Sequence, residues 1–560
     1  MYILGVSNGG ESGAALFKDN KLLCASNEER FSRIKLDSSF PKHSIMWCLQ
    51  FANIKPEDIA LITYGFSSGD ESSQNKSTWI NTLLSLDPKT LEGEIIRDRI
   101  LSETEVDKTQ YNLFHAEIKE LFLHSIPIIR YNHHFSHVAC AFVASGMDQS
   151  MVVTADGRGD YRSISIGIAT IDGFQEIYTS PSWHSLGYFY GRMTKLCGFT
   201  PNRHEGKVTG LAAFGDPKKA LPFVKKMISY KDGKILANIG EYYRPFFSNY
   251  SKKLIDEAKS FSSEDLAAAT QYYFEEMFVK LISFYIKKTG MNNICLAGGI
   301  FSNIKLNQKI YEINQDVDIF VYPNMGDGGI CVGSCYAWIW ENKKITLERI
   351  SSMYLGYELN KKSFLDILKT KNFLITQPED ISKEIVSLLK DGHSVGLSQG
   401  RTEFGPRALG NRTILASPQN NTIIQKINKQ LGRDTFMPLA PIMPLELTSK
   451  FLIFKNSNSF NKGFFMTMTY DSKPNLKTVA EAIVHVDGTV RPQFVDKENN
   501  AFLHNLLMSW YEHTGCPCLI NTSFNSHEEP IVNNEEDIIS AFDNKVVDYL
   551  VFPPYLIEHN

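Results

Sequence analysis

The chain has 560 residues and a formal net charge of −4 at pH 7, and 43% of its residues are hydrophobic while 21% are charged. This length predicts three or four structural units, at roughly 150 residues each. A slightly acidic chain does not indicate nucleic acid as a partner. No uncharged apolar run approaches the ~18 residues that would span a membrane.

The nine cysteines are scattered along the chain and lie mostly in apolar runs. Only Cys516 and Cys518 are close together, and their C-P-C spacing is neither that of a C-x-x-C motif nor that of a zinc knuckle. Reduced, buried thiols are typical of cytosolic proteins. The N-terminal MYILGVSNGGESGAALF lacks the basic segment and the long apolar segment of a signal peptide. We therefore expect a soluble, cytoplasmic protein.

Two segments of the first half of the chain share one pattern of strands and turns. Residues 1–30 predict three strands with a glycine-rich turn after the first, and residues 150–180 repeat this arrangement. A duplicated hairpin of this kind is typical of the actin-like ATPase fold, in which two ribonuclease-H-like halves face a nucleotide cleft. The polar and mostly helical pattern of residues 66–125 predicts an insertion between the two copies.

A pair of histidines, His133 and His137, opens an apolar stretch that is compatible with a helix. Spacing of four residues puts both imidazoles on one face of one turn, where a single metal ion can reach both. Asp156 and Asp327 each follow a strand-like run, and two histidines with one or two carboxylates suit Fe(II), Mn(II) or Zn(II). The alternative is a hydrogen-bonded pair in the core. His134 points about 100° away from His133 on a helix and is expected to be structural.

Residues 262–290 predict a long amphipathic helix with a serine cap and a closing glycine. Two strand-like runs beyond this helix end in glycine turns, one at Gly298 and Gly299 and one at Gly326 and Gly328. Such turns at strand-to-helix junctions expose backbone N–H groups that bind a phosphate or a ribose. The alternative is that these glycines are ordinary turn residues.

An interruption of the apolar pattern predicts a boundary before a second unit of mixed helix and strand, residues 365–560. This unit contains GRTEFGPRALGNR, in which Arg401, Arg407 and Arg412 lie among glycines. Rigid guanidinium groups suit bidentate binding of phosphate and carboxylate-like oxyanions. The alternative is surface arginines paired with neighbours such as Glu403. The surrounding glycines and proline favour anion binding.

These segments together resemble the O-carbamoyltransferases typified by NodU, CmcH and TobZ, and the match runs through nearly the whole chain. The motifs that carry the resemblance are EERFSRIK (28–35), HHFSH (133–137), EGKVTGLAAFG (205–215), AGGIFSN (297–303), GDGG (326–329), GRTEFGPRALGNR (400–412) and INTSFN (520–525). The resemblance implies an α/β protein with a TsaD-like domain of the actin-like ATPase fold over residues 1–345. A YrdC-like α/β domain would follow over residues 365–560.

The resemblance also implies two reactions in one chain. In the YrdC-like domain, carbamoyl phosphate and ATP with Mg²⁺ would form a carbamoyl adenylate. In the TsaD-like domain, a site for Fe(II) or another divalent transition metal would pass the carbamoyl group to a hydroxyl of a sugar or secondary metabolite. The partners would be these small molecules, with no nucleic acid and no membrane, and the chain could form a homodimer.

The resemblance assigns roles to particular residues. The metal ligands would be His133, His137, Asp156 and Asp327. The nucleotide would contact Gly298, Gly299, Asn303, Gly326 and Gly328. Carbamoyl phosphate and its adenylate would be bound by Arg401, Glu403, Arg407, Arg412, Arg433, Arg491, Asn521, Ser523 and Asn525. The catalytic residues would be Arg407, Lys207 and Glu205.

The chain departs from the family pattern at two places. Gly10 and Glu11 stand where the first hairpin usually carries His-Asp, and Leu431 stands where a lysine often precedes the arginine matched by Arg433. One alternative is therefore a degraded nucleotide- and metal-binding protein with a regulatory role. Another is carbamoylation of a non-alcohol acceptor, either a tRNA adenosine or a protein cysteine. Binding of a tRNA calls for a basic face, which a slightly acidic chain does not indicate. Enzymes that carbamoylate a protein cysteine carry an acylphosphatase-like unit and paired C-x-x-C fingers, and this sequence has neither.

Overall fold

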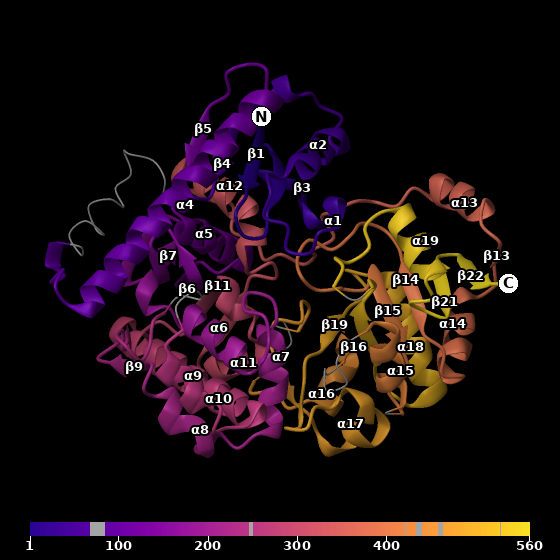
Figure 1. The fold of residues 1–560 in the computed structure, drawn as a ribbon. Coiled ribbons are helices and arrows are strands. Elements are labelled where there is room, and N and C mark those ends of the chain that lie inside the picture. The colour runs from indigo at the N-terminus through magenta and orange to yellow at the C-terminus, as the bar shows by residue number, and fades with distance from the viewer. Residues whose placement is uncertain (68–83, 246–249, 421, 433–438, 457–462, 527) are drawn as a thin grey trace. The chain divides into compact units, whose positions relative to one another are not determined.

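The computed structural model describes the chain except for residues 68–83, 246–249, 421, 433–438, 457–462 and 527 (Figure 1). Contacts within the chain separate two compact units. Residues 1–24 and 38–350 form the first unit, and residues 25–37 and 351–560 form the second. In the part of the chain so described, no helix is long and apolar enough to cross a membrane.

The first unit is built around two five-stranded sheets. The strand order of one is β3-β2-β1-β4-β5, and that of the other is β8-β7-β6-β11-β12. The strands of the first sheet are β1 (Tyr2–Ser7), β2 (Gly13–Lys18), β3 (Lys21–Asn27), β4 (Ile59–Tyr64) and β5 (Ile128–Arg130). Those of the second are β6 (Gln149–Gly159), β7 (Arg162–Thr170), β8 (Gly173–Pro181), β11 (Asn293–Ala297) and β12 (Asp318–Val321).

The two sheets share one topology. β1 pairs antiparallel with β2 and parallel with β4, while β6 pairs antiparallel with β7 and parallel with β11. Each sheet therefore has a hairpin at one end and parallel strands at the other, in the same order. This duplication confirms the α/β class and the two ribonuclease-H-like halves of the actin-like ATPase fold.

Two helices, α5 (His133–Ser145) and α12 (Ile330–Glu341), pack against each other at very short range. A Cβ placed on Gly333 of α12 would lie 2.2 Å from the carbonyl oxygen of Ser136 on α5, so only glycine fits there. The described side chains of α5 are buried except that of Phe135, because this helix is made of small and apolar residues around its histidines. The predicted helix at 262–290 is α10 (Ser263–Thr289), capped by the Ser262 hydroxyl and ended by Gly290 at a φ of 71°.

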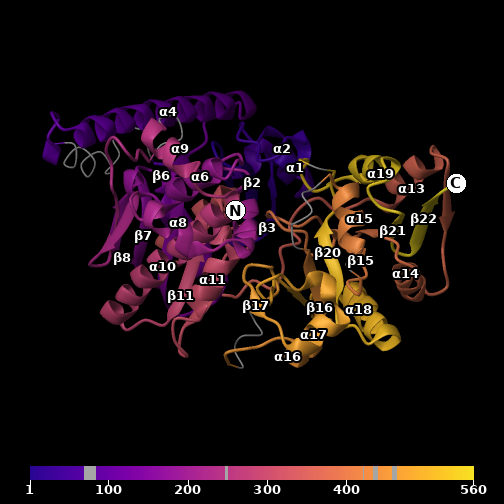
Figure 2. The same ribbon diagram turned by 60° about the horizontal axis from the view of Figure 1, so that its bottom comes forward.

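The insertion contains α4 (Leu91–Leu121), a single helix of 31 residues. Figure 2 shows it running along one side of the first unit. The other helices of this unit are α2 (Lys42–Phe51), α6 (Leu186–Leu196), α7 (Glu205–Leu211), α8 (Pro217–Val224), α9 (Lys252–Ala258) and α11 (Ile304–Tyr311). Its short hairpin is β9 (Ile228–Lys231) with β10 (Lys234–Ala237).

The second unit is an α/β domain around an eight-stranded mixed sheet of order β13-β22-β21-β14-β15-β20-β16-β19. Its strands are β13 (Phe373–Thr376), β14 (Val395–Ser398), β15 (Arg412–Ala416), β16 (Ala440–Pro444), β19 (Gln493–Val495), β20 (Leu519–Ser523), β21 (Tyr549–Phe552) and β22 (Tyr555–His559), with a separate pair β17 (Tyr470–Asp471) and β18 (Thr489–Val490). Its helices are α1 (Glu29–Ser32), α13 (Lys361–Lys369), α14 (Ile381–Lys390), α15 (Thr422–Gln430), α16 (Thr448–Phe451), α17 (Pro474–Val479), α18 (Ala501–Thr514) and α19 (Glu535–Asp543).

The segment 25–37, which includes the last three residues of β3, belongs to the second unit. The Arg30 guanidinium donates to the carbonyl oxygen of Gly405 at 2.7 Å. Arg33 donates to the carbonyl oxygens of Pro530 and Ile531, both at 2.8 Å. The motif EERFSRIK is therefore part of the second unit, which a boundary drawn in chain order cannot show.

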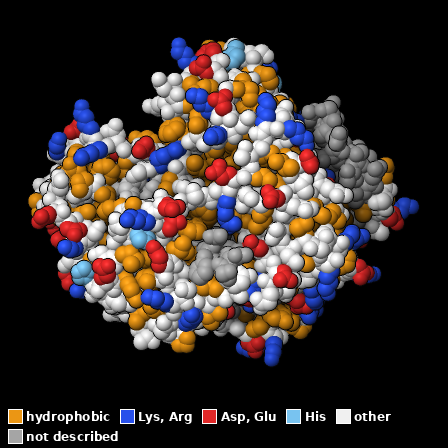
Figure 3. Space-filling view, turned by 180° about the vertical axis from the view of Figure 1, so that it is seen from behind, with side chains coloured by type: hydrophobic (Ala, Val, Ile, Leu, Met, Phe, Trp, Pro, Cys, Tyr) orange, Lys and Arg blue, Asp and Glu red, His pale blue; other side chains and the backbone are white. Residues whose placement is uncertain are grey.

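Acidic and basic side chains are interspersed on the face drawn in Figure 3. A surface of this kind has no large patch of one sign, so on this face it gives no long-range attraction to a polyanion. The absence of a basic patch on this face agrees with the small net charge of the chain.

The close contact between α5 and α12 generates a stability prediction. We expect Gly333→Ala to lower the melting temperature by several degrees, because a Cβ facing a backbone carbonyl forces the helices apart at a cost of about 1–3 kcal/mol. Differential scanning calorimetry measures the shift. Gly206→Ala in α7 is the matched control, since no atom lies within 4 Å of the added Cβ. Equal shifts in melting temperature for the two variants would show that the close approach of α5 and α12 does not require glycine at position 333.

Candidate functional site

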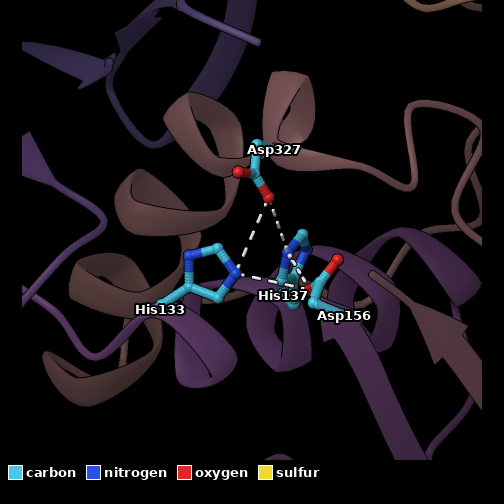
Figure 4. Close-up of side chains that lie close together, drawn as sticks. All are labelled: His133, His137, Asp156 and Asp327. Atoms are coloured by element: carbon cyan, nitrogen blue, oxygen red, sulfur yellow. Dashed lines mark hydrogen bonds and ion pairs between the residues drawn. The ribbon is translucent and has the colours of Figure 1, made fainter. Parts of the chain in front are cut away.

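His133 and His137 of the first unit lie on successive turns of one helix. The Asn132 side chain caps α5 by accepting from the backbone N–H of Phe135 at 3.2 Å, so His133 is the first helical residue. His137 follows four residues later on the same face. Asp156 near the end of β6 and Asp327 at the start of a short 3₁₀ turn (Asp327–Gly329) complete a cluster, shown in Figure 4.

The four side chains converge on one point. Asp156 Oδ2 lies 3.3 Å from His133 Nε2 and 3.0 Å from His137 Nε2. Asp327 Oδ1 lies 3.7 Å from the first of these nitrogens and 3.8 Å from the second. Donor atoms that share one ion at about 2.0–2.2 Å are about 3.0–3.5 Å apart, so these separations are close to those of a divalent metal site.

Burial and charge also fit a metal ion. Both imidazoles are buried, with His137 1% exposed. Burial lowers the pKa of His137, but the carboxylates of Asp156 and Asp327 outweigh it and raise this pKa to about 9. The pKa of Asp156 is well below its usual value because the two imidazoles outweigh the effect of burial. A buried carboxylate and a partly buried one facing two buried imidazoles form a site that a divalent cation would neutralise.

Backbone groups around the cluster fix its ligands. The backbone N–H of Gly299 donates to Asp156 Oδ1, which leaves Oδ2 toward the imidazoles. Gly298 has a φ of 104°, and a Cβ there would lie 2.2 Å from the carbonyl oxygen of Ala155. Asp160 accepts from the backbone N–H of His133 at 2.7 Å and thereby ties α5 to the β6–β7 hairpin.

Gly10 of the first hairpin lies directly against Asp327. A Cβ on Gly10 would be 2.0 Å from Asp327 Oδ2, so any larger side chain would displace this carboxylate. Glu11 lies near Gly326, whose ideal Cβ position is 3.4 Å from Glu11 Oε2. The departure from the family pattern at position 10 therefore has a steric reason in this chain.

His134 lies outside the cluster, as its place on the helix predicts. Its Nδ1 is 2.8 Å from the hydroxyl of Thr154, and burial lowers its pKa to about 3. A neutral imidazole with a hydroxyl partner serves packing.

Asn303, which is expected at the nucleotide, lies at the start of α11, and Glu205 and Lys207, which are expected to be catalytic, lie on α7. Asn303 caps α11 through the backbone N–H of Leu306, and its amide exchanges two hydrogen bonds with that of Gln271, at 2.9 and 3.1 Å. Glu205 begins α7, where burial raises its pKa. The Lys207 ammonium lies 5.7 Å from the centre of the Phe199 ring. The Asn303 amide is thus engaged within the protein.

In the second unit, Glu403 organises the loop of GRTEFGPRALGNR. Its Oε1 accepts from the backbone N–H groups of Leu409, Asn411 and Arg412, at 2.9, 2.7 and 3.1 Å. Glu403 is 1% exposed. A buried carboxylate with three N–H donors fixes the loop from inside, so the loop keeps one shape around it. Glu403 therefore fixes the loop through one of its two carboxylate oxygens.

Three further side chains hold the same loop from outside. The Tyr354 hydroxyl and the Gln493 amide each donate to the carbonyl oxygen of Leu409, at 2.7 Å. The Asn521 amide donates to the carbonyl oxygen of Ala408 at 3.1 Å and to Gln493 Oε1 at 2.7 Å. Asn521 is thus a buried support, and sequence reasoning missed Tyr354 and Gln493 because neither stands in a motif.

Arg412 does not have the geometry expected for an anion-binding residue. It is fully buried, and its five N–H donors face carbonyl oxygens of the protein: those of Tyr357, Gln399, Gly400, Asn411 and Asn533. Burial lowers its pKa to about 10. Because each donor already has a partner, the structure argues against the expected phosphate contact and gives Arg412 a structural role.

Other arginines of the motif differ in their surroundings. Arg401 donates to the carbonyl oxygens of Leu355 and Gly356, the second at 3.1 Å, so it too serves the backbone. Arg407 is half-buried on the loop that the side chains above hold, and Arg491 is also half-buried. Arg433 lies outside the described residues. Arg401 and Arg407 are both partly exposed, whereas Arg412 is fully buried.

The last two expected residues lie at the end of β20. Ser523 is half-buried there. The Asn525 amide donates to the carbonyl oxygens of Ser526 at 2.6 Å and Glu529 at 3.1 Å, and its side chain is 4% exposed. Asn525 therefore shapes the following turn.

Both halves of the chain match known families. Residues 2–336 match the family described as carbamoyltransferase N-terminus, and residues 386–559 match carbamoyltransferase C-terminus. The chain belongs to the carbamoyltransferase family. Its relatives include the uncharacterized protein MJ1051 of Methanocaldococcus jannaschii, 32% identical over 99% of each chain. Nodulation protein NolNO of Sinorhizobium fredii is 29% identical over 98% of this chain and 79% of its own length.

Nodulation protein U of Azorhizobium caulinodans is 28% identical to this carbamoyltransferase over 51% of each chain. Among solved structures, HypF of T. kodakarensis aligns with 61% of this chain and 48% of its own, with a TM-score of 0.34 and 12% identity. Component A of the (R)-2-hydroxyglutaryl-CoA dehydratase of Acidaminococcus fermentans aligns with 61% of this chain and 99% of its own, with a TM-score of 0.33 and 13% identity.

The cluster generates a metal-binding prediction. We expect the chelator-treated protein to bind one Mn²⁺ or, without oxygen, one Fe²⁺ per chain, and Asp156→Asn to weaken binding at least about 10-fold because a charged ligand is lost. Isothermal titration calorimetry measures both. His134→Asn, which keeps a polar partner for Thr154, is the control and should retain one site. The assignment of the cluster as a metal site would be contradicted if the wild type bound no metal, or if both variants lost metal affinity to the same extent.

The loop around Glu403 generates a second prediction. Glu403→Gln keeps the shape but removes the charge that three N–H donors share, which costs about 1.5–3 kcal/mol. We expect a lower melting temperature by calorimetry. Glu446→Gln is the matched control, since Glu446 contacts His504 at 2.9 Å but is 58% exposed. An unchanged melting temperature of the Glu403→Gln variant would show that the loop does not depend on this carboxylate.

Proposed function

We propose that this carbamoyltransferase is an ATP-dependent O-carbamoyltransferase that uses carbamoyl phosphate and forms a carbamoyl adenylate. The observation that carries the proposal is the buried cluster of His133, His137, Asp156 and Asp327, in a chain whose two parts match both carbamoyltransferase families. A small hydroxylated molecule would be the acceptor. The partly exposed Arg407 on a fixed loop of the second unit supports a separate site for phosphate groups.

The first reaction is assigned to the second unit. Carbamoyl phosphate is a weak electrophile because its nitrogen donates into the carbonyl, whereas a mixed anhydride with AMP has a better leaving group. Water would cleave carbamoyl phosphate to carbamate and phosphate, and a carbamate oxygen would then bond to the α-phosphorus of ATP as pyrophosphate leaves, so that one carbamoyl adenylate consumes one water and releases one phosphate and one pyrophosphate. Arg407, with Arg491, would bind the phosphate oxygens, since guanidinium groups match them in charge and shape.

The second reaction is assigned to the first unit. The acceptor hydroxyl oxygen bonds to the carbamoyl carbon, the bond to the AMP oxygen breaks, and the hydroxyl proton passes to a base. His133, His137, Asp156 and Asp327 would hold a divalent metal, which when bound would polarise the carbonyl and balance the phosphate charge. The N–H of Gly299 keeps Asp156 in position for this role. The choice of Fe(II) rests on the family resemblance and on a donor set without sulfur.

One observation favours a second candidate, a nucleotide- and metal-binding protein that transfers no carbamoyl group. Gly10 offers no side chain where the family pattern has a histidine, and the Asp327 carboxylate fills the space beside it. A missing proton donor would leave binding intact while slowing transfer. The intact cluster and the fixed arginine loop support the transferase over this candidate.

Two single substitutions separate the proposed reactions. Arg407→Ala should abolish the release of AMP and pyrophosphate from ATP and carbamoyl phosphate, because it removes the proposed phosphate contact. His137→Ala should keep the first reaction and lose carbamoylation of any acceptor. Pyrophosphate is measured by a coupled assay and the carbamoylated product by mass spectrometry. Normal pyrophosphate output from Arg407→Ala, or its loss in His137→Ala, would contradict the two-site proposal.

The wild-type protein decides between the two candidates. Pyrophosphate release that depends on carbamoyl phosphate supports the transferase. Binding of ATP and metal without such release supports the binding protein. Nucleotide binding is measured by isothermal titration calorimetry with a non-hydrolysable ATP analogue.

A further inference from the structure

A cavity of about 380 Å³ lies in the first unit, beside α6, α9 and the start of α10. Small-molecule sites in proteins have volumes of about 300–1,000 Å³, so this cavity has room for a small organic molecule. Among the described residues that line it, none is expected to bind the metal, the nucleotide or carbamoyl phosphate. The cavity therefore shares no lining residue with the sites of the two proposed reactions.

Most of the cavity wall is apolar. The apolar side chains come from the three helices and from the turn between α9 and α10: Leu196, Ile255, Ala258, Phe261 and Leu266. Ala258 is 6% exposed and Leu266 is 2% exposed, so both belong to the core of the first unit. The hydrophobic effect favours an occupant that covers such a wall with apolar surface.

Two contacts give the wall a fixed shape. Tyr250 lines the cavity, and the guanidinium carbon of the buried Arg192 lies 3.7 Å from the centre of its ring. The thiol of Cys197, just beyond α6, donates to the carbonyl oxygen of Ser263 at 3.6 Å and so ties the end of α6 to the start of α10. A wall that is held in this way loses little conformational entropy when a ligand binds.

The charged part of the lining is positive. It consists of Lys195 and Lys259, and no acidic residue is among the described residues that line the cavity. Lys259 pairs with Asp256 at 3.0 Å, but the two side chains are 71% and 52% exposed, so water screens this pair. Lys195 forms no ion pair within the part of the chain that the structure describes. The charge of the lining therefore attracts an anion.

The start of α10 adds to this attraction. Ser263, which lines the cavity, is the first residue of this helix of 27 residues. A helix N-terminus carries a partial positive charge, and its first N–H groups have no partner within the helix. The Ser262 hydroxyl accepts from the backbone N–H of Asp265 at 3.1 Å, and the Asp265 carboxylate pairs with Lys219 at 3.1 Å. The Ser263 hydroxyl can in addition donate a hydrogen bond to an anion.

We infer that this cavity binds a small amphipathic carboxylate, with its apolar body against the apolar wall and its carboxylate at Lys195, Lys259 and Ser263. A neutral apolar molecule would make no use of the two lysines, and a cation would be repelled by them. A short carboxylate such as acetate would leave the wall uncovered. The site is new with respect to the proposed function, and its occupation is measured without catalysis.

Isothermal titration calorimetry of the full chain tests the inference with four probes. Octanoate has both the apolar body and the carboxylate, octan-1-ol lacks the charge, octylammonium reverses it, and acetate lacks the apolar body. We expect octanoate to bind at one site per chain and octan-1-ol to bind several-fold more weakly. Octylammonium and acetate should show no binding. Failure of octanoate to bind, or equal affinities for octanoate and octan-1-ol, would overturn the inference.

Substitution of the lysines tests the position of the carboxylate. Lys195→Gln should lower the affinity for octanoate about fivefold, and the double variant with Lys259→Gln about tenfold or more, because each removes a partly exposed ion pair with the ligand. The affinity for octan-1-ol should not change. Lys252→Gln is the matched control, since Lys252 is an exposed lysine of α9 that does not line the cavity. Equal affinities of Lys195→Gln and Lys252→Gln for octanoate would contradict the assigned position.

A substitution that fills the cavity tests the position of the apolar body. Ala258→Leu places a larger apolar side chain in the wall and keeps both lysines, so it should abolish binding of octanoate and octan-1-ol alike. Its melting temperature should be equal to that of the wild type or higher, because filling a cavity adds packing contacts. Calorimetry measures both quantities. Undiminished binding of octanoate by a folded Ala258→Leu variant would place the ligand elsewhere and overturn the inference.

Discussion

The Asp156 carboxylate is the group on which the first unit depends most. One of its oxygens is bound by the backbone N–H of Gly299, and the other faces the imidazoles of His133 and His137. A buried carboxylate in this position must be balanced by positive charge. The residues around it therefore have little freedom, and the tight glycine turn at Gly298 and Gly299 follows from the need to bring backbone close to this oxygen.

The second unit also contains a buried charge, here the positive charge of Arg412. Arg412 is fully buried, and carbonyl oxygens face all its N–H donors, while the neighbouring Glu403 holds the same loop through three backbone N–H groups. Two buried charges thus fix a loop on which Arg401 and Arg407 are partly exposed. In both units, buried charge sets the shape of a site and glycine allows the close approach, which is how a rigid scaffold positions polar groups for chemistry.

The sequence alone predicted the duplicated fold and put His133 and His137 on one face, because strand-to-turn order and helical spacing are local. The family was predicted from the resemblance of its motifs. It could not predict that Arg412 would be enclosed by carbonyl oxygens, since these come from three separate segments. The transfer of segment 25–37 to the second unit depends on a bond between Arg30 and Gly405, which are 375 residues apart. Composition and motifs determine which groups are available, whereas only the tertiary structure decides which of them are used up in holding the protein together and which are left for a ligand.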